Sequence, residues 1–132
     1  MAADIDVSAD RFAAALEDIF TDARTAATEA GQEGVKAGAK ASAKAWRSNA
    51  RALFNGTGRY AKSVRSKVDR SGDEPQATVY STMPGLPHLL EKGHATLAGN
   101  RVPGREHVAP AADEGFKVAF ETAREVLEEG LK

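Results

Sequence analysis

Apolar residues recur at steps of three and four along the first half of the chain, and this spacing is typical of one face of an α-helix. Ser8 is suited to cap the start of such a helix, and the sequence Asn55-Gly56-Thr57-Gly58 is suited to end it. The pattern contains two stripes, which are Phe12, Leu16, Ile19, Phe20, Ala23, Ala27 and Ala30, followed by Val35, Ala39, Ser42, Trp46, Ala50 and Leu53.

The two stripes are out of phase. At about 100° per residue, the second stripe is rotated by roughly 140° from the first. Gly31 and Gly34 lie where the phase changes. Either the helix breaks or kinks there, or one long helix packs its front half on one partner and its back half on another. We favour a continuous or merely kinked helix, because no proline stops it.

A small antiparallel sheet is expected next. Tyr60, Val64 and Val68 alternate with polar neighbours, which is the pattern of a half-buried strand. Residues 69–75 contain turn-forming residues, and residues 76–82 form a second strand-like run. The sequence therefore predicts a β-hairpin.

The rest of the chain predicts irregular structure and then a helix. We expect a short helical turn at 88–91, then a mobile glycine-rich loop at 94–104 that makes a hairpin-like excursion, and a short third strand at 106–108. Pro110 suits the first turn of a C-terminal helix. One apolar face of that helix would consist of Ala112, Phe116, Ala119, Phe120, Ala123, Leu127 and Leu131.

These elements predict an α+β fold in one domain that spans residues 1–132. Hydrophobic residues make up 42% of the chain, but many are alanine, and aromatic residues make up 6%. The core should therefore be thin, and we hypothesise that other subunits complete some apolar faces. The N-terminus lacks the apolar segment of a signal peptide, and we expect no membrane span.

Charge is strongly segregated along the chain. The first 35 residues hold eight acidic and two basic side chains, whereas residues 36–70 hold ten basic and one acidic. Three interpretations of the basic helix face stay open: a solvated surface, contact with an acidic protein neighbour, or contact with DNA. Few aromatic residues accompany it, which argues against single-stranded nucleic acid. This basic ridge comprises Lys36, Lys40, Lys44, Arg47 and Arg51.

No catalytic or cofactor-binding motif stands out. The residues His88, Glu91, His94 and His107 could ligate a metal, but their spacing differs from the H-E-x-x-H helix motif. The chain has no cysteine and no phosphate-binding loop, and no G-x-S-x-G elbow accompanies its serines. We expect no enzyme activity, no metal and no cofactor. Trp46 is expected in the core or at a subunit interface.

Three blocks resemble the tail-completion (head–tail joining, neck) proteins of long-tailed bacteriophages. Residues 57–64 (T-G-R-Y-A-K-S-V) are similar to T-G-x-L-x-x-S-[IV], and residues 90–94 (L-E-K-G-H) are similar to L-E-[FY]-G-[TS]. Residues 101–111 (R-V-P-G-R-E-H-V-A-P-A) are similar to A-R-P-F-[ILM]-x-P-A. The positions of these blocks with expected structural roles are Gly58, Tyr60, Leu90, Glu91, Gly93 and Pro110.

The chain departs from the family pattern at several positions. Lys92, Glu106 and His107 stand where the family has an aromatic residue, a proline and a phenylalanine. We expect Glu91 and Arg105 to pair across the intervening loop.

The resemblance implies a long helix, a small antiparallel sheet and a C-terminal helix. It also implies a ring, with six copies favoured, in the virion at the head–tail junction and assembled in the host cytoplasm. The partners would be a tail-tube or tail-terminator protein and a head-connector protein, with DNA passing through the lumen unread. Candidate interface residues are the basic ridge together with Trp46, His94, Arg101 and Arg105. The alternatives are a nucleic-acid-binding module that uses residues 36–51, or a minor virion component of the same fold.

Overall fold

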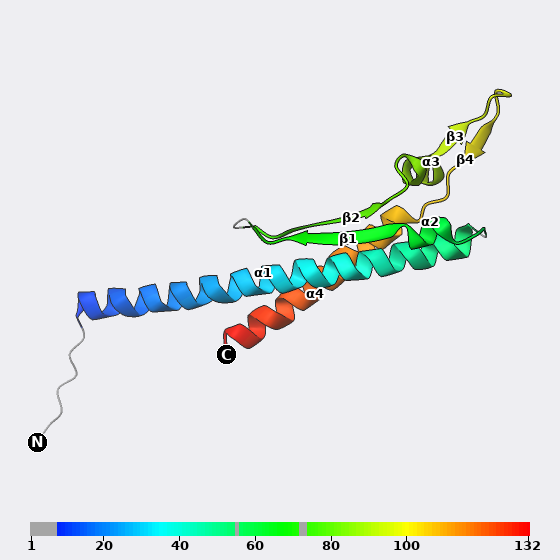
Figure 1. Cartoon of the computed structure of the whole chain (residues 1–132). Coiled ribbons are helices and arrows are strands. Elements are labelled where there is room, and N and C mark those ends of the chain that lie inside the picture. The colour runs from blue at the N-terminus through cyan, green and yellow to red at the C-terminus, as the bar shows by residue number, and fades with distance from the viewer. Residues whose placement is uncertain (1–7, 55, 72–73) are drawn as a thin grey trace, which may run out of the picture.

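The computed structural model describes residues 8–54, 56–71 and 74–132. The fold is α+β, as the sequence predicts: a long helix α1 (Ala9–Leu53) crosses the C-terminal helix α4 (Val108–Gly130), and small antiparallel hairpins lie between them in the sequence (Figure 1). The intervening elements are α2 (Arg59–Lys62), β1 (Val64–Asp69), β2 (Gln76–Ser81), α3 (Leu86–Lys92), β3 (Gly93–Ala95) and β4 (Arg101–Pro103).

Helix α1 is continuous, which confirms the favoured alternative (Figure 1). It begins at the predicted cap, where the Ser8 side chain accepts a hydrogen bond from the backbone N–H of Arg11 at 3.2 Å. The helix passes through Gly31 and Gly34 without a break. Gly34 is buried, and a Cβ there would lie 2.8 Å from the Ala119 carbonyl oxygen of α4. Glycine at this position therefore allows two helices to approach closely.

Helices α1 and α4 pack through rows of small residues spaced four apart. A Cβ on Gly38 would lie 2.8 Å from the Ala119 Cβ, and the Ser42 hydroxyl donates a hydrogen bond to the Ala111 carbonyl at 3.0 Å. Matching four-residue ridges are a common way for helices to interlock. The rows are Ala26, Ala30, Gly34, Gly38 and Ser42 on α1, and Ala111, Gly115, Ala119 and Ala123 on α4.

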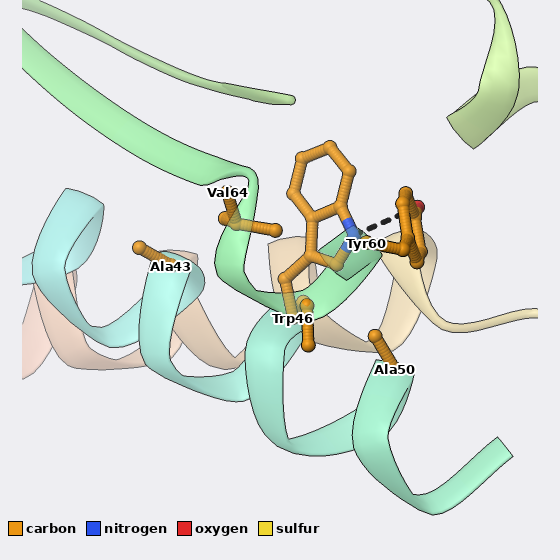
Figure 2. Packing of buried hydrophobic residues seen from close by; sticks show 7 residues of the cluster. Ala43, Trp46, Ala50, Tyr60 and Val64 are labelled. Atoms are coloured by element: carbon orange, nitrogen blue, oxygen red, sulfur yellow. Dashed lines mark hydrogen bonds between the residues drawn. The ribbon is translucent and has the colours of Figure 1, made fainter. Parts of the chain in front are cut away.

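The hydrophobic core lies where the second half of α1 meets α2, β1 and the start of α4. Trp46 is at its centre, with 5% of its surface exposed, and Val64 is fully buried (Figure 2). The core cluster comprises Ala43, Trp46, Ala50, Tyr60, Ala61, Val64 and Ala111. Most members are small, so this core is thin, as the composition indicates.

Strands β1 and β2 form the predicted hairpin, with Val64 opposite Ser81 and Asp69 opposite Gln76. The predicted start of the first strand at Tyr60 is wrong, because Tyr60 lies in the one-turn helix α2. Gly58 precedes this turn with a φ of 79°, a conformation that glycine readily adopts. The resulting turn brings the aromatic ring of Tyr60 into the core.

The hairpin-like excursion expected at 94–104 contains two paired strands, β3 and β4, in which His94 pairs with Val102. Gly93 has a φ of 84°, and Gly99 in the connecting turn has a φ of 86°. The Thr96 hydroxyl bonds both the N–H and the carbonyl of Asn100 at 3.1 Å, which closes the turn. Polar residues and glycines are frequent in this short hairpin, so it shows no alternating apolar pattern that would predict its strands.

The predicted third strand at 106–108 is also wrong, because Val108 begins α4. The N–H groups of His107, Val108 and Ala109 bond a carboxylate rather than a neighbouring strand. Pro110 lies in the first turn of α4, as predicted. The helical turn predicted at 88–91 is confirmed within the longer α3. None of the described helices combines the length and apolar character needed to cross a membrane.

Candidate interaction surfaces

A chain of buried polar side chains joins the core to the start of α4. The Trp46 indole N–H donates to the Tyr60 hydroxyl at 3.0 Å (Figure 2), and this hydroxyl lies 2.6 Å from Nε2 of His107. The other ring nitrogen of His107, Nδ1, lies 2.8 Å from the Arg105 carbonyl and 2.9 Å from Oε1 of Glu91. Because both neighbours of Nδ1 are acceptors, we assign the proton to Nδ1 and make Tyr60 the donor to Nε2.

Glu91 caps α4 from α3. Its carboxylate accepts the backbone N–H groups of His107 at 2.8 Å and of Val108 and Ala109 at 2.9 Å. Helix α4 has no side-chain cap of its own and no acidic residue in its first turn. Because the first N–H groups of a helix lack internal partners and attract negative charge, Glu91 supplies what the local sequence lacks.

This environment shifts the pKa values of two buried groups. Burial raises the pKa of the Glu91 carboxyl, but the hydrogen bonds from the α4 backbone and the neighbouring His107 outweigh it, so the pKa lies below its ordinary value. Burial raises the pKa of the Tyr60 hydroxyl, and the Glu91 charge adds to this, while the bond from Trp46 opposes it. This series of hydrogen-bonded side chains is therefore most stable with Glu91 ionised and Tyr60 protonated.

The expected pairing of Glu91 with Arg105 is wrong. The Arg105 guanidinium instead donates to the Leu53 carbonyl at 3.1 Å, at the C-terminal end of α1. Its backbone N–H donates to the Leu90 carbonyl at 2.8 Å. A cation near the negative end of a helix dipole is favourable. Arg105 and Glu91 thus pin the same segment to two different helix ends.

The segment from α3 to β4 projects away from the helices (Figure 1). Leu97 in its turn is fully exposed, and Val102 is 41% exposed. Arg101, a candidate interface residue, is exposed, although its guanidinium donates to the Lys92 carbonyl at 2.9 Å. His94 is half-buried, and its Nδ1 has no hydrogen-bond partner within the described ranges. The projecting hairpin thus offers an apolar tip for contact.

Four residues of the basic ridge are solvent-exposed: Lys36, Lys40, Lys44 and Arg51. The fifth, Arg47, is half-buried, and its guanidinium donates to the Val64 carbonyl at 2.9 Å. Trp46, the other α1 residue predicted at an interface, lies in the core and leaves almost no surface for a neighbour.

The front half of α1, defined as Ala9–Thr25, extends beyond the end of α4 and leaves large apolar side chains exposed. Helix α4 ends beside Ala26, because a Cβ on Gly130 would lie 3.0 Å from the Ala26 Cβ. Beyond that point the exposed fractions are 62% for Phe12, 60% for Ile19 and 64% for Phe20. Such a concentration of exposed aromatic and aliphatic surface is typical of a binding site.

Helix α4 carries a further apolar surface. Phe116 is 64% exposed and Phe120 is 71% exposed. Phe116 lines an open apolar groove between α1, α4 and β2, together with Val35, Ala39, Ala77, Val79 and Ala112. The apolar face predicted for this helix is therefore only partly covered by α1.

Sequence patterns missed the Glu91 cap and the polar chain behind it. Glu91 and His107 do meet, but as structural partners, and the two lie on opposite sides of a hairpin. In the described part of the chain, no group of three or more His, Asp or Glu side chains is placed to hold a metal. One signal was available: α4 begins without a Ser, Thr, Asp or Asn cap, which implies an acceptor from elsewhere.

Comparison of the chain with models of known protein families finds no match, and comparisons with curated proteins and with solved structures find none either. Function is therefore inferred from the residues and surfaces of this chain.

Proposed function

We propose that this protein is a structural subunit of the ring that joins tail to head in a long-tailed bacteriophage. In this proposal, copies of the chain form a ring of about six subunits, an expectation that rests on the resemblance. Its neighbours are a tail-tube or tail-terminator protein on one side and a head-connector protein on the other. DNA passes through the lumen, and the chain performs no catalysis.

The observation that carries the proposal is the meeting of the three family-like blocks. Tyr60 belongs to the first block, Glu91 to the second and His107 to the third. These three side chains form one hydrogen-bonded unit at the start of α4, with His107 fully buried. Blocks that are far apart in the sequence therefore build one structural feature. In this feature Glu91 stands at a position that matches the family pattern, whereas Tyr60 and His107 stand where the pattern has a leucine and a phenylalanine.

The exposed surfaces suit a subunit that is completed by neighbours. The front half of α1 presents Phe12, Ile19 and Phe20 to solvent, and the β3–β4 hairpin presents Leu97. A ring requires two different patches on each copy, because each subunit meets its neighbours head to tail. The front half of α1 and the projecting hairpin are the patches that we assign to contacts with other subunits.

The proposal is tested by electron microscopy and light scattering of the purified chain, alone and mixed with its connector and tail-terminator partners. We expect ring-shaped particles larger than the 13.9 kDa monomer once the partners are present. Replacing Phe12 and Ile19 with serine should abolish the rings while the monomer stays folded, because both side chains are exposed. Thr21→Ser, at an exposed polar position of the same helix, is the matched control.

Two results would contradict the proposal. Density for this chain away from the head–tail junction of an intact particle would assign it to another place in the virion. Retardation of arbitrary duplex DNA, with a steep dependence on salt and loss on reversal of Lys40 and Arg47 to glutamate, would favour the nucleic-acid-binding alternative.

A further inference from the structure

Between Asp18 and Arg51, one face of α1 carries a charge pattern that changes sign between Glu33 and Lys36. Its acidic residues are Asp18, Asp22, Glu29 and Glu33, and its basic residues are those of the basic ridge. Successive members are three, four or seven positions apart, so in a continuous helix they share one side. We call this surface the charged face.

The charged face is open to contact. Apart from Glu33 and Arg47, which are half-buried, all its residues are exposed. Within the described ranges, no ion pair joins any of its side chains to another residue, although the Arg47 guanidinium bonds the Val64 carbonyl. Both signs of charge are therefore available to an external partner.

The spacing on this face is symmetric. Asp18 and Arg51 lie equally far from a centre between Gly34 and Val35, and the same holds for Asp22 and Arg47. Glu29 with Lys40, and Glu33 with Lys36, complete the symmetry. If a second copy of α1 lies antiparallel against this face, every acidic residue is level with a basic residue of the other copy.

We propose that the free protein forms an antiparallel dimer through the charged face of α1, centred between Gly34 and Val35. The occupant is a second copy because the face complements itself in charge at all four acidic positions. Two copies also meet without overall repulsion, because the formal net charge of the chain is −1. A two-fold contact of this kind uses the same patch on both subunits.

A parallel pair shifted by five helical turns would also align unlike charges, because Asp18 is as far from Lys36 as Glu33 is from Arg51. That arrangement uses the acidic half of one copy and the basic half of the other, and it leaves the remaining halves unpaired. The antiparallel pair uses both halves of both copies and closes on itself. It also sets the helix dipoles in opposition, which is electrostatically favourable.

This inference goes beyond the proposed function, because it concerns the free protein. Neighbours in a ring are related by rotation about the ring axis and cannot be antiparallel to one another. The dimer must therefore open before assembly, and salt sets how readily it does so. Screening shortens the range of charge interactions from about 10 Å at 0.1 M salt to about 3 Å at 1 M.

Sedimentation equilibrium at low and high salt tests the association. We expect a dimer at low ionic strength that dissociates as salt is added. Glu29→Lys and Lys40→Glu should each weaken the dimer about tenfold or more, because like charges then meet at two symmetric places. The double variant should recover the wild-type affinity, since both charges are exchanged. Both side chains are exposed, so circular dichroism should show unchanged folding.

Cross-linking tests the orientation. The chain has no native cysteine, so single cysteines can be introduced freely. In the antiparallel pair the two copies of position 36 lie about 4.5 Å apart along the axis, whereas those of position 44 lie about 28 Å apart. A short bismaleimide should therefore join Lys36→Cys copies efficiently and fail to join Lys44→Cys copies, the matched control on the same face.

A chain that stays monomeric at low salt, or a double variant that does not recover, would overturn the dimer. Cross-linking between Asp18→Cys and Lys36→Cys copies, without cross-linking of Lys36→Cys alone, would overturn the antiparallel orientation in favour of the shifted parallel one. These outcomes are separable from the proposed function, because ring formation is read from particle shape and from the Phe12 and Ile19 variants. Rings without a low-salt dimer would reject this inference alone.

Discussion

The front half of α1 and its back half, Ala26–Leu53, belong to one uninterrupted helix but have opposite surroundings. The back half is covered by α4, α2 and the β1–β2 hairpin, and it buries Trp46 and Ala50. The front half also holds large apolar side chains, yet Phe12 and Phe20 remain more than 60% exposed. The largest apolar side chain of the back half, that of Trp46, is thus buried within this chain, while those of Phe12, Ile19 and Phe20 in the front half are left uncovered.

The comparison teaches that periodicity reveals an apolar face but not what covers it. The out-of-phase stripes correctly indicate that the two halves of the helix face different surroundings. A helix as short as the front half would be marginal in isolation, but here the packed back half supplies the nucleus from which it extends. The stability of the front half therefore depends on its being continuous with the packed back half, rather than on apolar contacts of its own.

The largest expected contrast between the halves is in side-chain truncation. Trp46→Ala should lower the free energy of unfolding by about 3–5 kcal/mol, because it opens a cavity and leaves the Tyr60 hydroxyl without its donor. Phe20→Ala in the exposed half should change it by less than about 0.5 kcal/mol. Urea unfolding of both variants measures the difference, and equal costs would break the comparison.

Glu91→Gln should cost about 2 kcal/mol, because it removes the charge that accepts three backbone N–H groups at the start of α4. Since folding lowers the pKa of Glu91, this stabilisation is present above the ordinary pKa of a glutamate and is lost as pH falls through the folded value. Wild-type stability should therefore fall from about pH 5 to pH 3 more steeply than that of the variant. Parallel pH profiles would contradict the assigned role.

Two glycines of α1 give a sharper test of where the helix is covered. Gly38→Ala should destabilise the protein by about 1–2 kcal/mol, because the new methyl group would lie 2.8 Å from both the Ala119 Cβ and the Gly115 carbonyl oxygen. Gly31→Ala meets nothing within 4 Å and should stabilise the helix by up to about 1 kcal/mol. Thermal unfolding of the pair checks the sign. Destabilisation by both would mean that the helix is covered at Gly31 too.

The smallest expected effect is in local opening of the front half. Amide hydrogens of residues 13–22 should exchange with opening free energies near zero to about 2 kcal/mol, whereas those near Trp46 should approach the global value. Hydrogen exchange measured residue by residue gives this gradient. Uniform protection in the monomer at high salt would show that the front half is held by contacts within the chain.

The sequence predicts the long periodic elements well. Helices α1 and α4 and the β1–β2 hairpin follow from residue spacing, and the Ser8 cap follows from residue type. The sequence pattern does not reveal the contact between α1 and α4, because rows of glycine and alanine form no strongly hydrophobic stripe. The strands of the β3–β4 hairpin do not follow from the sequence, because each has three residues, too few to show an alternating pattern.

The residues of the polar chain behind Glu91 were all noticed, but for other reasons. The sequence predicts Trp46 in the core or at an interface, and it singles out Glu91 and His107 as residues that could ligate a metal. Their hydrogen bonds join α1, α2, α3 and the start of α4, and no local pattern encodes such distant pairing. The exposure of the basic ridge, by contrast, follows directly from its helical spacing.

The position of the Glu91 carboxylate has a consequence for which parts of this sequence can vary in evolution. The chain leaves Glu91, forms the β3–β4 hairpin and returns to the same carboxylate at His107. Both ends of the β3–β4 hairpin are therefore held in place at Glu91. The turn around Leu97 makes no contribution to the core. Residues at the tip can be exchanged or added with little effect on folding. One scaffold can thus adapt to different neighbours by variation in a segment that starts and ends at a single point.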